Sequence, residues 1–531
     1  MKGREPMKIN EILEAVAIPE NSEGSAEFIK DWKDIEITGL SYHSKRVETN
    51  HLFFCIKGYE TDGHKYLPEA VRKGAAAAVV EDIQPGIDIP QIKVKNSRIA
   101  LAKSAANFYH HPSKKLQVIG ITATNGKTTT SFMAHKILKD QNMEAGIIGT
   151  VMVQYRNKKI PSLLTTPESL DLQKHFNGMV EEGVSHVTME VSSSAQELHR
   201  VDGVDFDIVT LNNISREHID SHGSFERYFE VKSRLITRAK SDSAAVLNLD
   251  DAYSKGLISK TKSKVFTFGI EDSSGDFSVK NLDLSTGRGV FTLVINKDLH
   301  HKGVRIPKGE IDINLSVPGF HSVYNSVVAA IIGLLSGVDK SGVKKSLKAF
   351  RGVERRFEFL YEKDFKIVDD HFANAGNIHM TLGTLKEMEY NNLHVLYAIR
   401  GKRGVAVNRE NTEALVEWLP KLGVTELLAT ESVSHVMEKD RVTAEEREVF
   451  QQVTKASGIP TRIIKELPEA VATIMKKAEP GDVVLLAGCQ GMDYGGEMAL
   501  KILVKGKTPK EQDEILAPLK DRVAGIAEEN E

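Results

Sequence analysis

At 531 residues the chain is longer than one hydrophobic core usually organises, so we expect two to four domains and take three as the working number. Hydrophobic residues make up 41% of the chain and charged residues 27%, and no apolar run approaches the roughly 18 to 20 residues that a membrane span requires. The 70 Lys and Arg residues against 73 Asp and Glu residues give a formal net charge of -3, which argues against a nucleic-acid surface over the whole molecule and favours small anionic ligands in local basic pockets.

Residues 1–114 are predicted to form a small α/β domain. Strand-like runs such as residues 51–56 alternate with helix-like runs, and the alanine- and valine-rich run 75–80 is predicted to be a buried strand that follows a helix. Pro112 interrupts this pattern just before a glycine-rich stretch and indicates a domain boundary.

Residues 115–350 are predicted to form a central α/β domain, and residues 351–531 a third. Helical stretches separate the strand candidates of the central domain, as expected for a parallel sheet with helices on both faces. The candidates are residues 118–121, 187–191, 208–211 and 244–249 in the central domain, and 365–369, 393–399 and 482–487 in the third. The tail after Thr508 is charged and is expected to be helical.

The stretch 120–130, GITATNGKTTT, lies between a predicted strand and a helix expected at residues 131–138. A glycine turn in this place gathers backbone N–H groups at a helix N-terminus, where the helix dipole also favours an anion. Lys127 adds a positive charge, and Thr128 has a hydroxyl where such loops hold Mg²⁺. The strict GxxxxGK[ST] spacing is not met, because Ile121 occupies the position of the first glycine. A plain glycine turn with a surface lysine therefore stays open as an alternative.

The same stretch resembles the nucleotide loop of the Mur ligases, whose usual form GxTGTNGKTT accounts for the longer spacing, with Ala123 in place of a glycine. Further matches have an order and intervals similar to those of the MurE type, which extends UDP-N-acetylmuramoyl-dipeptide by one amino acid. They are TTP at 165–167, MEVSS at 189–193, HRV at 199–201, NN at 212–213, EHID at 217–220 and YFEVK at 228–232. The resemblance implies a three-domain α/β architecture with a central P-loop ATPase domain and a Rossmann-like C-terminal domain.

The resemblance further implies an ATP-dependent ligase, which transfers the γ-phosphoryl group of ATP to a carboxylate and so forms an acylphosphate. Such a transfer needs positive charge and metal ions around the phosphates. ATP would be bound by Gly120, Thr122, Thr124, Asn125, Gly126, Lys127, Thr128 and Thr129. By the same resemblance Mg²⁺ would be held by Thr128, Glu190, His218 and Lys232, with Lys232 carbamylated so that it ligates as an anion. Lys127, Glu190, His218 and Lys232 are then the catalytic set.

Three of these residues have structural alternatives. Glu190 ends an apolar strand, where a carboxylate is costly unless it is paired or bound to metal, and it is otherwise a strand-end residue in solvent. His218 is otherwise a histidine whose hydrogen bonds are satisfied within the fold. Lys232, on a helix expected at residues 225–236, is otherwise a solvated surface lysine.

The nucleotide-sugar side of the resemblance rests on hydroxyl groups and one arginine. Contacts to the UDP-sugar peptide are implied for Thr165, Thr166, Ser192 and Arg200, and an arginine among hydroxyls suits carboxylate and phosphate oxygens. Ser44 lies in a segment that resembles the uridine-binding region, although the usual Asp–Ser–Arg triplet is His43–Ser44–Lys45 here.

Contacts to the adenine nucleotide are implied for three residues further along the chain, Asn325, Arg356 and Asp370. Asn325 lies in PGFHSVYN, which resembles the segment that closes the central domain. Asp369 or Asp370 is the candidate carboxylate that orients ATP, and a structural role at the end of a strand is an equal alternative for both.

The largest departures from the family pattern fall where the incoming amino acid should bind. Residues 427–435, LLATESVSH, replace an Asp–Asn–Pro–Arg motif and contain no arginine. Residues 488–493, GCQGMD, replace a Gly–Lys–Gly–His–Glu segment, with Asp493 as a stand-in for the glutamate. The basic loop 400–404 is a candidate for acceptor or phosphate binding and equally an ordinary exposed loop.

The sequence thus predicts a ligase that adds an amino acid to UDP-N-acetylmuramoyl-L-alanyl-D-glutamate. We expect a cytoplasmic monomer with small-molecule partners, because the N-terminus has no apolar signal core and the only cysteines are Cys55 and Cys489. One alternative is a divergent Mur-type ligase that joins a different carboxylate and amine outside peptidoglycan synthesis. Another is a nucleotide-binding regulator without turnover, which has no need for the two metal sites that Glu190, His218 and Lys232 imply.

Overall fold

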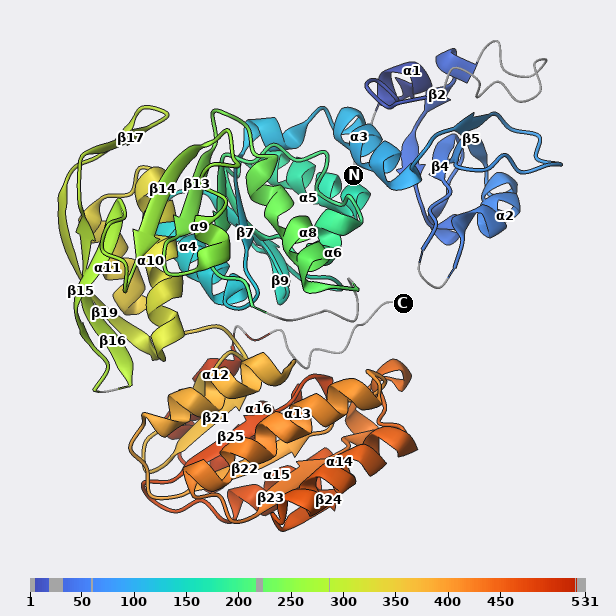
Figure 1. The fold of residues 1–531 in the computed structure, drawn as a ribbon. Helices are drawn as coiled ribbons and strands as arrows, with labels where there is room; N and C mark the ends of the chain where they lie inside the picture. The colour runs from blue at the N-terminus through green and yellow to red at the C-terminus, as the bar shows by residue number, and fades with distance from the viewer. Residues whose placement is uncertain are drawn as a thin grey trace. The chain divides into compact units, whose positions relative to one another are not determined.

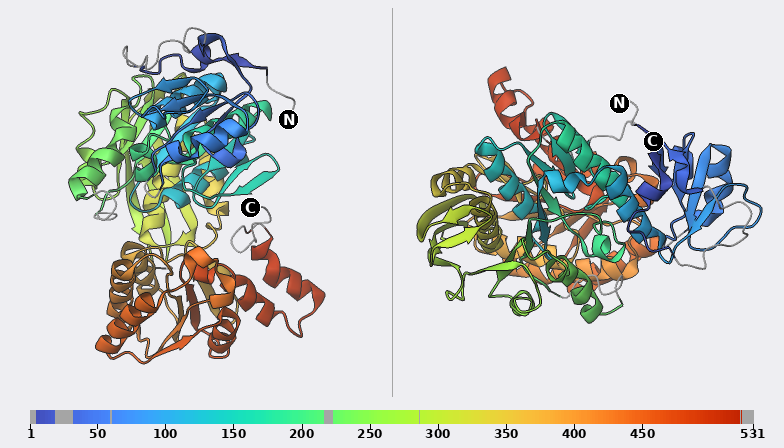
Figure 2. Two further views of the ribbon diagram at one scale, coloured as in Figure 1. Left: turned by 90° about the vertical axis from the view of Figure 1, so that its right-hand side faces the viewer. Right: turned by 90° about the horizontal axis from the view of Figure 1, so that it is seen from above.

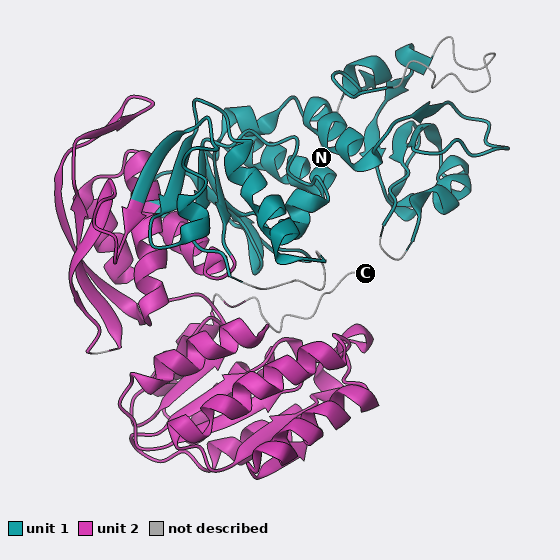
Figure 3. Cartoon of the chain, in the orientation of Figure 1, with its two compact units in different colours: residues 1–123, 138–267 teal, residues 124–137, 268–531 magenta. Residues whose placement is uncertain are grey.

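The structure is a computed structural model that describes residues 5–18, 32–58, 61–215, 223–285, 287–520 and 522. The chain divides into two compact units (Figure 3): residues 1–123 with 138–267, and residues 124–137 with 268–531. Within the described residues no helix combines the length and the apolar character needed to cross a bilayer. The domain boundaries at residues 114 and 350 stay a prediction.

The N-terminal sheet of the first unit has four parallel strands in the order β3-β4-β5-β6. Successive side chains of β4 and β5 alternate between two hydrophobic clusters, one shared with α3 and one with α2, because both faces of these strands are covered. The strands predicted at 51–56 and 75–80 are confirmed as β4 and β5. The elements are β1 (Met7–Lys8), α1 (Ile9–Ile12), β2 (Glu36–Ile37), β3 (Gly39–Ser41), β4 (His51–Phe54), α2 (Leu67–Arg72), β5 (Ala75–Val80), β6 (Gln91–Lys93) and α3 (Ser97–Phe108).

The larger sheet of the first unit has the strand order β10-β9-β8-β11-β7-β12-β13-β14 (Figure 1). The five strands β8, β11, β7, β12 and β13, adjacent in this order, are parallel, so that their carboxyl ends share one edge. All four strands predicted for this region are confirmed, as β7, β11, β12 and β13. The elements are β7 (Gln117–Thr122), β8 (Ala145–Ile148), β9 (Met152–Tyr155), β10 (Lys158–Pro161), α5 (Ser169–Glu181), β11 (His186–Glu190), α6 (Ser193–Glu197), β12 (Ile208–Leu211), α8 (Phe225–Thr237), β13 (Ala244–Asn248), α9 (Ala252–Lys255) and β14 (Lys264–Gly269).

The second unit begins with the residues that open α4 (Lys127–Asp140), the helix expected after the glycine-rich stretch. The last two residues of β14 pair with β15, which continues into an antiparallel run β15-β16-β19. On β19 exposed and buried residues alternate, as in a strand with one face in solvent. The elements are β15 (Phe277–Asp283), β16 (Arg288–Ile295), β17 (Leu299–His301), β18 (Val304–Ile306), β19 (Gly309–Pro318), α10 (Phe320–Leu335) and α11 (Lys340–Ala349).

The C-terminal sheet has the order β20-β21-β25-β22-β23-β24, and every strand except β20 is parallel to its neighbours. Helices cover both faces, α12 to α14 on one and α15 with α16 on the other, each over its own hydrophobic cluster (Figures 1 and 2). The elements are β20 (Glu358–Glu362), β21 (Lys366–Asp370), α12 (Ala375–Lys386), β22 (Leu393–Ala398), α13 (Val405–Trp418), β23 (Leu427–Thr430), α14 (Ala444–Ser457), β24 (Thr461–Ile464), α15 (Leu467–Met475), β25 (Val483–Ala487), α16 (Gly495–Leu503) and α17 (Pro509–Leu516).

This topology confirms the α/β fold class and the three strands predicted for the region, as β21, β22 and β25. Strand β25 lies between β21 and β22. The loop after β25 leads to α16 on one face of the sheet, whereas the loops after β21 and β22 lead to α12 and α13 on the other face. Ligands of open α/β sheets bind at such a reversal, outside the carboxyl ends of the strands. The helix expected in the tail is α17, which starts with a capping box between Thr508 and Glu511.

Candidate functional site

The glycine-rich stretch connects β7 to α4, as its pattern predicts. Gly126 has a φ of 89°, and a Cβ added to it would lie 2.3 Å from Asn325 Oδ1, so both its backbone conformation and the close approach of α10 require glycine. Lys127 opens the helix and its ammonium donates to the carbonyl of Thr124 at 3.0 Å. Thr128 is buried in the first turn, beside half-buried Thr129.

Three other residues predicted to bind nucleotide, Gly120, Thr122 and Asn125, make close contacts within the fold. Gly120 lies inside β7, where an added Cβ would come within 2.7 Å of the ring of Phe206, so it serves strand packing. The Thr122 hydroxyl donates to the carbonyl of Val191 at 2.7 Å and ties β7 to the residue after β11. Asn125 accepts from Asn377 Nδ2 at 2.9 Å.

Glu190 is the last residue of β11 and is 0% exposed, which excludes the solvated strand-end alternative. Its strand pairs with β7 on one side and β8 on the other, so its side chain lies at the carboxyl edge between them. Both carboxylate oxygens accept hydrogen bonds from Thr150: Oε1 from the backbone N–H at 2.8 Å and Oε2 from the hydroxyl at 3.0 Å.

Lys232 lies on α8 and is 2% exposed, which excludes a surface lysine. Its ammonium donates to the carbonyl of Ala123 at 2.7 Å and lies 4.9 Å from the centre of the Tyr228 ring. The side chain therefore reaches the backbone of the predicted nucleotide loop. His218 lies outside the described residues.

The residues predicted to contact the sugar peptide form one network around the end of β11. The Thr166 hydroxyl donates to the carbonyl of Glu190 at 2.8 Å and accepts from the N–H of Ser192 at 3.1 Å. Ser192 is the N-cap of α6. Arg200 donates to the carbonyl of Thr166 at 3.2 Å and pairs with Glu168 at 2.9 Å. Arg98 of α3 pairs with the same carboxylate at 3.2 Å, so one acid holds two guanidinium groups.

Ser44, predicted for uridine, lies apart from this network in the N-terminal sheet region. It is buried, and its hydroxyl donates to Glu69 at 2.6 Å. Asn325 of α10 is also buried, and its Oδ1 accepts from the Thr130 hydroxyl at 3.2 Å, which joins α10 to α4.

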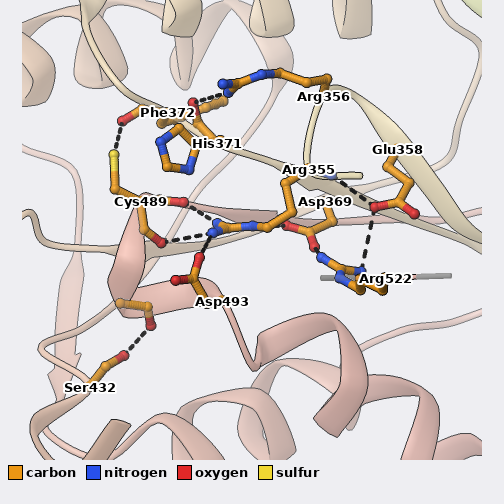
Figure 4. Close-up of polar contacts among 12 residues, drawn as sticks. Arg355, Arg356, Glu358, Asp369, His371, Phe372, Ser432, Cys489, Asp493 and Arg522 are labelled. Atoms are coloured by element: carbon orange, nitrogen blue, oxygen red, sulfur yellow. Dashed lines mark hydrogen bonds and ion pairs between the residues drawn. The ribbon is translucent and has the colours of Figure 1, made fainter. Parts of the chain in front are cut away.

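The carboxyl edge of the C-terminal sheet is dominated by a buried ionic cluster (Figure 4). Arg355 is 4% exposed and has a φ of 56°, a conformation unusual for a residue with a Cβ. Its guanidinium pairs with Asp369 at 3.3 Å and with Asp493, and it donates to the carbonyls of Gly488 and Cys489. Asp493, the predicted stand-in for an acceptor-binding glutamate, is therefore neutralised from within the fold. Burial nevertheless raises its pKa to about 6 against the opposing effect of Arg355.

Arg522, from the end of the chain, joins the same cluster through Asp369 and through Glu358 at 3.4 Å. Burial raises the pKa of Glu358 to about 7, with Arg522 acting against the rise. Asp370 accepts from the N–H of Phe357 at 2.6 Å, and burial raises its pKa to about 6 while Arg356 lowers it. Arg356 itself donates to the carbonyl of His371 at 3.4 Å.

The basic loop 400–404 is held by acids of the same domain. Glu446 accepts the N–H groups of residues 402 to 404 at 2.8–2.9 Å, and Arg403 pairs with Asp440 at 3.0 Å. Arg400 donates to the carbonyl of Ala373, and its Nε is buried with no partner in the described part of the chain. These contacts leave both alternatives for the loop open.

Sequence reasoning missed the residues that support the site from neighbouring elements: Gly149, Thr150, Glu168 and Arg98. A signal for the first two existed, because a glycine and a threonine directly follow the apolar run 145–148 that forms β8. Polar residues after a buried parallel strand lie at the edge where ligands bind. Which partner strand they face depends on the strand order, which the sequence does not contain.

Three family models match the chain. Residues 121–333 match the Mur ligase middle domain, residues 355–490 the model described as Mur ligase, glutamate ligase domain, and residues 36–109 the model described as Mur ligase family, catalytic domain.

Curated proteins match along nearly the whole chain. The UDP-N-acetylmuramoyl-L-alanyl-D-glutamate--2,6-diaminopimelate ligase of Caldanaerobacter subterraneus subsp. tengcongensis is 34% identical over 474 residues, 87% of this chain and 91% of the relative. The ligase of the same name from Bacillus velezensis is 33% identical over 467 residues, 86% of this chain and 90% of the relative.

Solved structures show the same fold. A structure of a UDP-N-acetylmuramoyl-L-alanyl-D-glutamate--2,6-diaminopimelate ligase covers 94% of this chain and 99% of its own, with a TM-score of 0.63 and 22% identity. The Mycobacterium tuberculosis folylpolyglutamate synthase complexed with ADP and AMPPCP covers 77% of this chain and 96% of its own, with a TM-score of 0.59 and 15% identity.

Proposed function

The chain belongs to the Mur ligase family, and from this premise we propose that it is an ATP-dependent amide-bond ligase that adds an amino acid to UDP-N-acetylmuramoyl-L-alanyl-D-glutamate in peptidoglycan precursor synthesis. Relatives at 33–34% identity that carry the name of such a ligase support this substrate. The observation that carries the proposal is the placement of two fully buried groups, the Glu190 carboxylate and the Lys232 ammonium, at the carboxyl edge next to β7 and the loop that follows it.

In the proposed reaction the terminal phosphoryl group of ATP moves to the substrate carboxylate, and the amine of the incoming amino acid displaces it as phosphate. Lys127, at the start of α4, would attract the phosphates, and the N–H groups of the same turn would bind their oxygens. Closing the site against water would protect the acylphosphate from hydrolysis.

The donor set suits Mg²⁺, which prefers carboxylate and hydroxyl oxygens. Thr128 and Glu190 provide such groups, and both are buried. The metal would neutralise charge on the phosphates as they approach the carboxylate. We also propose that Lys232 is carbamylated, since carbamylation turns a buried cation into a carboxylate-like ligand, and that His218 completes the set.

The remaining roles are those that the family resemblance implies, and only the first set lies in the network at the end of β11. We propose that Thr165, Thr166, Ser192 and Arg200 face the sugar peptide, that Ser44 serves the uridine, and that Asn325, Arg356 and Asp370 serve the adenine nucleotide. We further propose three domains with boundaries near residues 114 and 350, a monomer, and a cytoplasmic location.

A second candidate, a Mur-type ligase with another acceptor or donor, is favoured by the pairing of Asp493 with Arg355. The carboxylate of Asp493, which would otherwise be available to bind a charged incoming amino acid, is paired with Arg355 instead.

The test incubates the protein with ATP, Mg²⁺ and UDP-N-acetylmuramoyl-L-alanyl-D-glutamate, or with another carboxylate in its place, and adds single amino acids in turn. Phosphate release and the mass of the nucleotide product are measured. We expect release with at least one amino acid, accompanied by a product heavier by that residue. Release only with other carboxylates would favour the second candidate, and silence with every pair would reject both.

A further inference from the structure

Thr150 and the Glu190 carboxylate meet because β8 and β11 are paired in parallel, with Ile148 opposite Met189. This register places the two residues after β8, Gly149 and Thr150, beside the last residue of β11. The backbone N–H of Thr150 donates to Glu190 Oε1 at 2.8 Å and its hydroxyl to Oε2 at 3.0 Å. One residue therefore holds both oxygens of a carboxylate that is 0% exposed.

Gly149 makes this approach possible. A Cβ added at this position would lie 2.3 Å from Glu190 Oε1, closer than real Cβ atoms come, and 3.0 Å from its carboxyl carbon. Both atoms belong to a buried side chain held on two sides by neighbouring strands, so the carboxylate has no room to retreat. The Gly149–Thr150 pair thus fits the carboxylate as a built cradle.

The same hydroxyl extends the contact toward the residues proposed to face the sugar peptide. Thr150 Oγ1 lies 3.1 Å from Thr165 Oγ1. A hydroxyl has one proton to donate. Because the Thr150 hydroxyl donates its proton to Glu190 Oε2, the proton between the two hydroxyls comes from Thr165. The order of donation is then Thr165 to Thr150 to Glu190.

We infer that Thr150 is a positioning residue, which orients the Glu190 carboxylate for a divalent cation and couples that orientation to Thr165. Partners of this kind fix a ligand in place, and their loss typically costs about 10- to 100-fold in metal affinity. The inference rests on the proposed function, since it takes Glu190 as a metal ligand.

The test compares Thr150→Val, which removes the hydroxyl and keeps the shape, with Thr150→Ser, which keeps the hydroxyl. The matched control is Thr188→Val: Thr188 lies on β11, is fully buried, and its hydroxyl has no partner among the described residues. Binding of a non-hydrolysable ATP analogue is measured by calorimetry across a Mg²⁺ series and in EDTA.

For Thr150→Val we expect half-maximal binding at about 10-fold more Mg²⁺, with unchanged affinity in EDTA. Thr150→Ser and Thr188→Val should stay within about twofold of the wild type. In a Glu190→Gln background, Thr150→Val should add less than about twofold, because the hydroxyl acts through the carboxylate. If the valine variant does not fold, as judged by thermal melting, Thr150→Ala takes its place.

Equal Mg²⁺ dependence of Thr150→Val and Thr188→Val would overturn the inference, as would effects that multiply in the Glu190→Gln background. With a wild type that still releases phosphate, either result leaves the proposed function standing. A wild type that binds no Mg²⁺–nucleotide would instead refute the proposed function, and the inference with it.

Discussion

A lysine that is 2% exposed, as Lys232 is, stays charged in a protein interior only where acceptors or an anion offset the lost hydration. The carbonyl of Ala123 is such an acceptor, and it belongs to the turn that leads into the nucleotide loop. The proposed carbamylation would replace the positively charged ammonium of Lys232 with a negatively charged carbamate, whose oxygens accept hydrogen bonds or bind metal.

Replacing Lys232 with Ala should therefore lower phosphate release by about 100-fold or more, since a metal ligand is lost. Adding millimolar propionate should restore part of the rate, because a small carboxylate fits the space that the side chain leaves. The rate is measured with and without the acid in both proteins. Rescue absent at every concentration, with nucleotide binding intact, would contradict the carbamate.

Glu358 illustrates how burial sets the pH response of a single group. Burial raises its pKa from 4.5 to about 7, while Arg522 opposes the rise. Between these two values the folded chain holds a proton that the unfolded chain has released. Its contribution to stability is therefore complete below pH 4.5 and is lost as the pH rises through 7.

Replacing Glu358 with Gln should flatten this dependence, since glutamine does not titrate. The free energy of unfolding is measured by urea denaturation from pH 4.5 to 8. The difference in slope integrates to about 3 kcal/mol, because one pKa unit corresponds to about 1.4 kcal/mol. Glu389→Gln, at an exposed position, should keep the wild-type slope. A variant curve parallel to that of the wild type would show that burial does not protonate this group.

At the scale of elements, the start of α4 combines a backbone requirement with a contact. Gly126 holds a φ of 89° just before the helix, and α10 approaches it through Asn325. Gly458 after α14 has a φ of 74° and open space around it. A substitution at Gly458 would therefore cause backbone strain alone, whereas one at Gly126 would cause the same strain and also a steric clash with Asn325.

Gly458→Ala should lower the free energy of unfolding by about 1 kcal/mol through strain alone and leave nucleotide binding unchanged. Gly126→Ala should cost more than this, since Asn325 must also move, and should weaken nucleotide binding by at least about 10-fold. Denaturation and calorimetry with ADP report the two effects. Equal nucleotide affinity in both variants would show that the turn before α4 does not bind phosphate.

At the scale of the whole molecule, Arg522, which follows α17, contacts the first strands of the C-terminal sheet. Arg522 pairs with Asp369 on β21 and with Glu358 on β20, both of which lie more than 150 residues earlier in the chain. The carboxylates of Asp369 and Glu358 thus depend on a residue that follows α17.

Arg522→Ala should destabilise the protein by about 3 kcal/mol, because it leaves buried acids without a counter-charge. Lys520→Ala, an exposed change two residues away, should stay within about 0.5 kcal/mol of the wild type. Both values come from urea denaturation. Similar stabilities for the two variants would mean that the cluster does not need the chain end.

The strands were predictable wherever burial on both faces produces a continuous apolar run, as in β7, β13 and β25. The antiparallel run β15-β16-β19 escaped prediction because its one-sided alternation is a weaker signal between helical segments. The family resemblance pointed to Glu190 and Lys232, whose roles stay a proposal, whereas Thr150 was not expected, since its contact exists only through the register of β8 with β11. Arg355 was missed for a similar reason: its partners come from loops more than 130 residues away.

The predicted nucleotide loop and the proposed acceptor edge follow strands of separate sheets, each with its own hydrophobic clusters. A change at Arg355 would therefore repack one edge without disturbing the strands that carry the other. In a ligase with this architecture, the specificity for the amino acid can therefore change while the residues proposed to transfer the phosphoryl group stay the same.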